Sequence, residues 1–156
     1  MKKRQKSMLT EVIVVITITA IAVFGMVNFK DYVNKSEAIK SMNNLSIIVK
    51  NHKDQYGMIP SESYIEQVKD YLQGSLRLGK LQYRSRWIDY DSSPDTILAY
   101  TERNYRSPFV KSGFVVLRLD GQVQWMGNAE FKQTFATQQK PEEIECLKKD
   151  IPNPVE

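Results

Sequence analysis

The sequence predicts an α+β protein in which one long N-terminal helix packs on a small antiparallel sheet. Three observations support this prediction. Residues 12–27 carry no charged side chain, residues 33–56 place apolar side chains at helical spacing, and the chain after Gly79 is rich in β-branched and aromatic residues separated by turn formers. The length of 156 residues, with 42% hydrophobic residues and one cysteine, suits a single small folded unit without an internal disulfide framework.

The positive charge of the chain is concentrated at its N-terminus. Residues 1–6 hold four of the 22 lysines and arginines. When these four and Glu11 are set aside, 18 basic and 17 acidic residues remain, so the rest of the chain is nearly neutral. A nearly neutral body with a basic N-terminus indicates contact with a membrane surface and not with nucleic acid.

The first elements along the chain are a basic leader over residues 1–6 and a helix predicted over residues 7–56. A membrane span of about residues 8–29 is expected at the start of this helix, because that length at 1.5 Å per residue covers the ~30 Å hydrocarbon core of a bilayer. The positive-inside rule keeps the leader in the cytoplasm and places the rest of the chain outside. This is the pattern of a signal anchor.

A cleaved secretory signal peptide is an alternative for the same segment, with Ala20-Ile21-Ala22 as the cleavage site. Two features weigh against it. The apolar run continues for five residues beyond Ala22, where a secreted chain normally turns polar, and a charged Glu11 at the start of an apolar region is unusual. The alternative stays open at this point.

Glu11 is the most informative residue of the N-terminal segment. An acidic side chain at the edge of a hydrophobic span costs a few kcal/mol unless it is paired, so it indicates a functional site.

The stretch Ser7-Met8-Leu9-Thr10-Glu11-Val12-Ile13-Val14-Val15-Ile16 resembles the N-terminal methylation motif of type IV pilins and type II secretion pseudopilins. The resemblance implies a processed chain that begins at Ser7, with Glu11 fifth and paired with the N-methylated amine of a neighbouring subunit. Lys6 stands before that cut, where the family nearly always has glycine, so Lys6 and Ser7 mark the expected processing site. A cut after Ser7 would follow a small residue but would make Glu11 fourth.

The long helix is predicted to continue past the membrane, because apolar side chains recur every three to four residues up to Tyr56. A separate second helix with a break at Asn28 is the alternative. Gly57 and Pro60 are stop signals. Met42-Asn43-Asn44-Leu45, together with this tyrosine, glycine and proline, also resembles the pseudopilin pattern.

Residues 57–139 are predicted to form an α+β unit, which we call the head. The pattern Ser63-x-x-Glu66 is a capping box and predicts a helix over residues 64–72. Asp120-Gly121 is expected to form a two-residue hairpin turn, and Asn128 is expected to cap a helix over residues 129–136. Strands are predicted at residues 81–83, 86–88, 96–100 and 114–117 and on to residue 125.

Residues 140–156 are predicted to form a short helix from Pro141, followed by a disordered tail from Ile151. The segments 94–100 and 115–125 resemble the C-terminal region of pseudopilin-like proteins that end in an Asp-Gly hairpin.

Two groups of residues suggest metal or acid–base chemistry. His52, the single histidine, is expected to have a structural or exposed role. Asp89, Asp91 and Asp95 offer oxygen ligands for calcium, which some major pseudopilins bind in a C-terminal loop. A polar turn is the stronger interpretation of the same loop, because Asp and Ser favour turns.

Two further features allow binding or cross-linking. Cys146 is expected to make an apolar contact, with an inter-subunit disulfide as the alternative. Cross-strand pairing is expected for a set of interleaved arginine and aromatic residues, for which stacking of bases is the alternative: Arg84, Arg86, Arg106, Tyr83, Trp87 and Tyr105. The sequence has no Walker loop, GxGxxG or HExxH motif, so an enzyme is not expected.

The resemblance implies a pseudopilin-like subunit of a type II secretion or type IV pilus-like assembly that acts by helix-mediated polymerisation. It would be a single-pass protein of the bacterial inner membrane with a cytoplasmic N-terminus and a periplasmic head. Its partners would be other pilin-like subunits and inner-membrane assembly proteins, in a homo- or hetero-oligomer, without a cofactor. The alternative is a signal-anchored or secreted extracytoplasmic binding module that does not polymerise.

Overall fold

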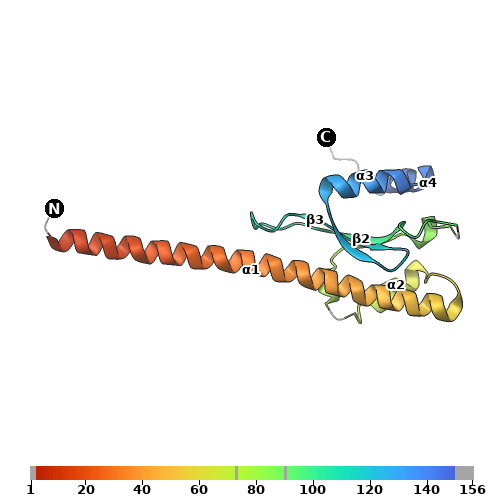
Figure 1. Cartoon of the computed structure of the whole chain (residues 1–156), viewed down its shortest axis with the longest axis horizontal. Coiled ribbons are helices and arrows are strands. Elements are labelled where there is room, and N and C mark those ends of the chain that lie inside the picture. Colours follow the sequence, from red (N-terminus) through yellow and green to blue (C-terminus); the bar gives the residue numbers. More distant parts are fainter. Residues whose placement is uncertain (1–2, 73, 90, 150–156) are drawn as a thin grey trace.

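The computed structural model describes residues 3–72, 74–89 and 91–149, with the side chains of residues 3–7, 9 and 147–149 left out of the description. One long helix, α1 (Lys3–Tyr56), extends beyond the head, which lies along its C-terminal part (Figure 1). The predicted α+β layout, a long apolar N-terminal helix with a small antiparallel sheet, is therefore confirmed.

α1 runs through Asn28 without a break, so the alternative of two separate helices is wrong. It ends at Tyr56 because Gly57 adopts a left-handed conformation with φ of 73°. The Gly57 N–H donates to the Lys53 carbonyl at 2.8 Å, which satisfies one of the last carbonyls of the helix.

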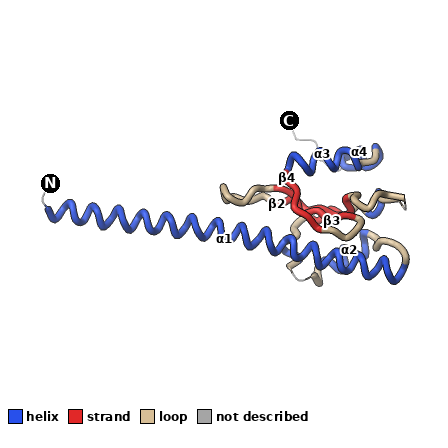
Figure 2. The backbone as a smooth tube through the Cα atoms, in the orientation of Figure 1, coloured by secondary structure: helices blue, strands red, loops and turns tan. Residues whose placement is uncertain are grey.

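The sheet is an antiparallel meander of four strands in sequence order. They are β1 (Leu81–Tyr83), β2 (Ile97–Arg103), β3 (Gly113–Arg118) and β4 (Val123–Gly127). α1 lies on one face of the sheet, and α3 (Asn128–Gln138) and α4 (Pro141–Lys149) lie on the opposite side (Figure 2).

The sheet has an apolar core on each face. The core facing α1 is built from helix and strand side chains that include Ala38, Met42, Leu45, Val49, Leu98, Ala99, Val115 and Leu117. The core facing α3 consists of Ile97, Val116, Met126, Phe131 and Phe135, with Tyr100 and Phe114 packed against it. Side chains from β3 alternate between the two cores, as the pleat requires.

The register between β2 and β3 shifts between Ile97 and Ala99. Leu98 and Ala99, although adjacent, both belong to the core facing α1. A β-bulge explains this, because the extra residue interrupts the alternation of side chains along the strand.

The helix after the long one begins earlier than the capping pattern predicts. α2 spans Glu62–Lys69, and its N-cap is Ser61, whose Oγ accepts from the Tyr64 N–H at 3.3 Å. Ser63 therefore lies inside the helix and does not cap it. The helix stops before Leu72 because the last turn tightens into i→i+3 bonds, and a 3₁₀ turn at Ser75–Arg77 follows.

The strand predicted at residues 86–88 is wrong. Residues Ser85–Trp87 form a 3₁₀ turn, with the Trp87 N–H donating to the Arg84 carbonyl at 2.9 Å. β1 ends where Arg84 turns its side chain into the protein, and the chain leaves the sheet edge at that point.

The hairpin between β3 and β4 is confirmed, but its turn has three residues and not two. The Gly121 N–H donates to the Arg118 carbonyl at 3.0 Å, and the Arg118 N–H donates to the Gln122 carbonyl at 2.9 Å. Gly121 has φ of 89°, so a type I turn is followed by a glycine bulge. The Asp120 N–H, within the turn, donates to the Pro94 carbonyl, which lies outside the hairpin.

Of the two C-terminal helices, α3 is longer than expected at both ends and is not capped by Asn128, whereas α4 begins where it was predicted. α3 begins at Asn128 itself, with Gly127 as its N-cap and the Gly127 N–H donating to Glu130 Oε2 at 3.4 Å. α4 begins at Pro141. The tail from Ile151 lies outside the described residues.

Candidate functional site

The apolar half of α1, residues 8–29, projects beyond the head as a single helix (Figure 1). The side chains from Val12 to Val27 are exposed, and the most apolar 18 residues have a mean hydropathy of 2.5 with none buried. By length and composition this helix is apolar enough to span a membrane. Soluble chains rarely leave so large an apolar surface open to water, and a surface of this kind is typical of contacts with lipid or with other helices.

The polar side chains of the apolar half bond to their own helix. Thr17 Oγ1 donates to the Ile13 carbonyl at 2.8 Å, and Thr19 Oγ1 donates to the Val15 carbonyl at 2.9 Å. Asn28 Nδ2 donates to the Phe24 carbonyl at 2.9 Å. In hydrocarbon a polar group needs an internal partner, so these three side chains suit a membrane environment.

Glu11 lies on the exposed surface of α1, immediately before the charge-free run. The backbone of Lys6 and Ser7 continues the same helix, and their side chains lie outside the described ones. The site predicted for leader processing therefore stays a prediction, and so does the pairing of Glu11 with a neighbouring amine.

The three arginines predicted to interleave with aromatic residues occupy three different places. Arg84 is buried, Arg86 is exposed and forms an ion pair with Glu62 at 3.6 Å, and Arg106 lies in the loop between β2 and β3. They share no surface on which bases could stack. The cross-strand pairing expected for them is also wrong, because Arg84, Arg86 and Arg106 all lie outside the strands.

Arg84 forms a buried ion pair with Glu143 of α4. Its Nε and Nη2 donate to the two carboxylate oxygens at 2.7 and 2.8 Å, and the two side chains are 4% and 3% exposed. The guanidinium also donates to the carbonyls of Ile97 at 2.7 Å and Gln138 at 3.0 Å. Sequence reasoning missed Glu143, because its partner lies 59 positions away and no local spacing links them.

Tyr105, an aromatic residue of that set, is also engaged within the protein. Tyr105 stacks on Trp125 with ring centres 5.9 Å apart, and Lys35 Nζ of α1 lies 4.0 Å from the centre of the same ring. Desolvation lowers the pKa of Lys35 and raises the pKa of Tyr105. This stack fastens α1 to β4, which is a structural role.

Tyr83 provides a pH-dependent contribution to stability. Its hydroxyl donates to the Pro60 carbonyl at 3.1 Å, and burial raises the pKa of Tyr83 above its ordinary value of 10.0. Below pH 10 the Tyr83 phenol is neutral in both the folded and the unfolded chain. As pH rises beyond 10 the unfolded chain ionises first, so the contribution of Tyr83 is lost on the alkaline side.

We expect Tyr83→Phe to lower the free energy of unfolding by about 1 kcal/mol at pH 8, because the bond to Pro60 is lost. The difference from the parent chain should shrink as pH rises above 10, because phenylalanine does not ionise. Urea unfolding in detergent, followed by tryptophan fluorescence across this range, checks both statements. A constant difference between the two chains from pH 8 to the alkaline end would contradict the second.

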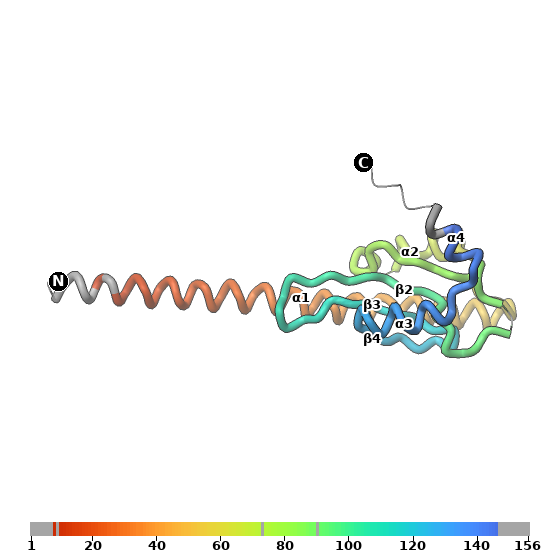
Figure 3. Tube along the Cα trace, turned by 90° about the horizontal axis from the view of Figure 1, so that it is seen from above, coloured from red at the N-terminus to blue at the C-terminus, as the bar shows by residue number. Residues whose placement is uncertain are grey.

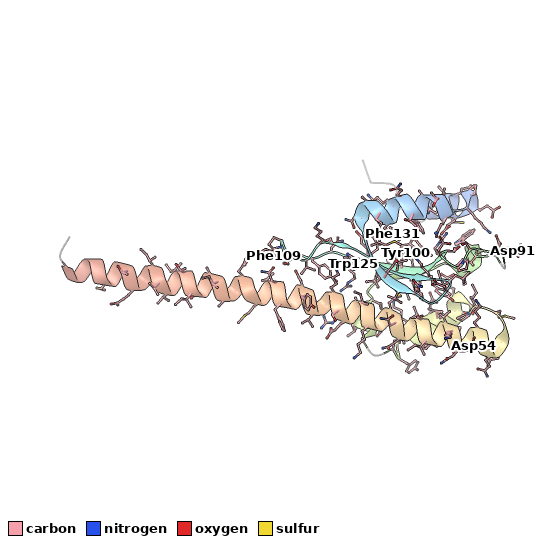
Figure 4. The ribbon with its side chains drawn as sticks, viewed as in Figure 1. Asp54, Asp91, Tyr100, Phe109, Trp125 and Phe131 are labelled. Carbon is pink, nitrogen blue, oxygen red and sulfur yellow. The ribbon has the colours of Figure 1, made fainter. Side chains whose placement is uncertain are left out.

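The three aspartates proposed for calcium do not converge. Asp89 pairs with Lys140, Asp95 accepts from the Ser93 hydroxyl, and Asp91 is exposed at the end of the head far from the apolar half of α1 (Figure 4). The Ser93 hydrogen bond is the main cause that lowers the pKa of Asp95. Within the described residues, no three His, Cys, Asp or Glu side chains form a group that could hold a metal ion. The loop fits a polar turn, as the stronger interpretation had it.

His52 lies at the far end of α1, beside an open cleft of about 900 Å³. Its ring contacts those of Tyr56 and Tyr64, with centres 4.6 and 4.9 Å away. Its Nδ1 is buried and has no hydrogen-bond partner among the described residues. The cleft is also lined by Glu62, Glu66 and Arg86, so it joins aromatic surface with charges of both signs.

Cys146 is exposed on α4, so the expected apolar contact is wrong. The helix turns Glu143, and not Cys146, into the protein. An inter-subunit disulfide stays a prediction.

Comparison of this chain with protein-family models, with curated proteins and with solved structures finds no match in any of the three.

Proposed function

We propose that this chain is a membrane-anchored, pilin-like subunit that assembles laterally through the apolar half of α1. One observation carries the proposal: a single continuous helix is exposed and free of charge over residues 12–27 and is packed under a small sheet over its C-terminal part. A helix in which one end needs lipid and the other supports a folded head is suited to holding that head at a membrane surface.

The four basic residues before the span support a cytoplasmic N-terminus and a head on the other side, which in a bacterium is the periplasmic side of the inner membrane. The partners would be other pilin-like subunits and the inner-membrane proteins that assemble them, as in type II secretion or type IV pilus-like systems. The role is assembly and not catalysis.

Glu11 would direct the lateral contact. Its carboxylate sits at the start of the charge-free run, where the amine at the N-terminus of a neighbouring subunit can approach it. A carboxylate and an ammonium group that approach one another there attract strongly, because the dielectric constant is low, and this attraction would stabilise an assembly. Small residues at 20, 22 and 25 leave room for a neighbouring helix on the same segment.

We expect Glu11→Ala to reduce subunit association in native membranes by about thirtyfold, the effect of losing one charge pair worth about 2 kcal/mol. The measurement is photo-cross-linking from a probe residue at Ile16, which is exposed on the apolar half. Asp54→Ala is the matched control, because it removes an acidic side chain from the opposite, exposed end of the same helix (Figure 4). Equal cross-linking of the Glu11 variant and the control would refute the assembly role.

The intact mass of the membrane-bound chain tests processing separately. A chain that begins at Ser7 or Met8 with an added methyl group would establish cleavage of the leader. A chain that begins at Met1 would establish a signal anchor, and a soluble chain that begins at Val23 would establish a secreted protein.

An extracytoplasmic binding module that does not polymerise is the second candidate. The cleft beside His52 favours it, because the rings of His52 and Tyr64 lie there next to charges of both signs, a combination suited to contact with a peptide or a glycan. Under this function Glu11→Ala changes nothing, whereas His52→Ala abolishes ligand binding.

A further inference from the structure

The loop between β2 and β3, residues 104–112, lies against α1 where the apolar half ends. Figure 3 shows the two strands running along α1 toward the N-terminus, with their connection crossing the helix at the edge of the head. Figure 1 shows the same connection on the sheet side of α1. This loop is therefore the part of the head closest to the segment that would enter a membrane.

Hydrogen bonds fix the loop to the helix. Asp31 Oδ2 accepts from the backbone N–H groups of Arg106 and Ser107 at 3.1 and 2.8 Å. The buried Ser107 hydroxyl donates to Asn28 Oδ1 and accepts from the N–H groups of Phe109 and Val110 at 3.1 and 3.3 Å. The position of the loop along α1 is thus built into the fold.

The tip of the loop carries an aromatic side chain beyond these bonds. Phe109 is 75% exposed, and its ring meets that of Phe24 edge to face, with centres 5.9 Å apart (Figure 4). Phe24 belongs to the charge-free run, five residues before Phe29, which is about 7 Å along the helix axis. The Phe109 ring therefore reaches alongside the apolar half. Pro108 lines the adjoining apolar groove with Val23.

Basic side chains surround this aromatic tip. Arg106 and Lys111 flank it in the loop, Lys30 follows the apolar half on α1, and all three are exposed. Of the nearby acidic groups, Asp31 is engaged by the loop backbone. Aromatic rings next to exposed lysine and arginine are typical of the layer where acyl chains meet anionic headgroups.

We propose that the β2–β3 loop is a second membrane-contacting element, with Phe109 at the acyl boundary and Arg106 and Lys111 on anionic lipid headgroups. The inference rests on the proposed membrane span of α1. Two points of contact, a span and a loop bonded to it at Asn28 and Asp31, fix the rotation of the head about the helix axis. The head would then present one defined side to its neighbours.

The test uses the full chain in vesicles of phosphatidylethanolamine and phosphatidylglycerol. An environment-sensitive dye is attached at Val110→Cys in a Cys146→Ser background, and quenching by nitroxide lipids labelled near the headgroup is measured. We expect strong quenching at this position and none for the dye at Asp91→Cys, at the opposite end of the head. Quenching at position 110 as weak as at position 91 would overturn the proposal.

A third dye position separates this inference from the proposed function. The dye at Ile18→Cys, within the apolar half, should be quenched by nitroxides deep in the acyl chains. Quenching there without quenching at position 110 keeps the span and overturns the loop contact. Absence of quenching at both positions overturns both. Dye fluorescence at position 110 that is not quenched by lipid nitroxides but changes with the protein-to-lipid ratio would mean that the loop contacts a second copy of the chain. That result also overturns the proposal.

Two variants test the chemistry of the contact. Phe109→Asp should lower quenching at position 110 by at least about twofold, because a carboxylate is costly at the acyl boundary. Tyr56→Asp, at the far end of α1, should not change this quenching.

The double variant Arg106→Gln/Lys111→Gln should weaken the preference of the loop for phosphatidylglycerol over phosphatidylcholine by about fivefold for each charge removed. Lys50→Gln/Lys53→Gln is its control. Equal lipid preference in the two double variants would overturn the headgroup contact.

Discussion

Replacing Glu143 by alanine is expected to lower the free energy of unfolding by about 3–5 kcal/mol. The reason is that Arg84 keeps its charge but loses both of its charge-assisted bonds, at 2.7 and 2.8 Å, in a place where neither side chain reaches water. The carbonyls of Ile97 and Gln138 remain, and they satisfy hydrogen-bond donors without neutralising the charge. The guanidinium also lies 4.7 Å from the centre of the Phe135 ring, so its displacement disturbs the core facing α3.

Urea unfolding of the full chain in detergent, followed by the fluorescence of Trp87 and Trp125, measures this change. Glu142→Ala is the matched control, because Glu142 is the exposed neighbour on the same helix turn and should cost under about 0.5 kcal/mol. The double variant Arg84→Met/Glu143→Leu should recover most of the loss, since apolar residues can replace a buried ion pair as a unit. A loss below about 1 kcal/mol for Glu143→Ala would show that the pair does not hold α4 in place.

Replacing Leu45 by alanine is expected to lower the free energy of unfolding by about 2–5 kcal/mol. Leu45 is 0% exposed and lies on α1 in the middle of the core between this helix and the sheet. Its truncation leaves a cavity, because the helix and the strands around it can relax only partially to close the space. The same contact joins α1 to the head, so the loss weakens the link between them.

Ile47→Ala is the control for this second prediction, because Ile47 is 58% exposed two residues further along the same helix. Its loss should stay within about 0.5 kcal/mol. The two variants are compared by urea unfolding under the conditions used for Glu143. Similar losses from both would mean that α1 does not dock on the sheet through the face described here.

Features that depend on neighbouring residues could be predicted from the sequence. The end of α1 follows from Gly57, whose positive φ and bond to Lys53 terminate a helix locally. The hairpin follows from alternating side chains on both sides of Asp120 and Gly121. The apolar half of α1 could be predicted because a long charge-free run indicates a span-length helix without reference to the rest of the chain.

Features that depend on distant residues could not be predicted. Residues 86–88 have strand-like composition, but the backbone turns there after Arg84, whose side chain reaches Glu143, 59 positions away. The sequence pattern predicts Ser63 as the N-cap of α2, whereas Ser61 has the extended backbone geometry of an N-cap in the structure. Composition does not distinguish two serines that lie two positions apart. The hydrogen bond between the β2–β3 loop and α1 joins Ser107 to Asp31, 76 positions apart, so no local sequence motif predicts this contact.

The continuity of α1 has a mechanical consequence. Its 54 residues make a rod about 80 Å long, and the head is tied to it by Ser41 Oγ, which donates to the Gly74 carbonyl at 2.9 Å, and by Ser46 Oγ, which donates to that of Gly121 at 2.6 Å. Because the rod passes from the apolar half into the head without a break, an axial displacement of the apolar half is carried to the head along one continuous helix. A shift of α1 along its axis by the rise of one residue would carry the head with it by about 1.5 Å.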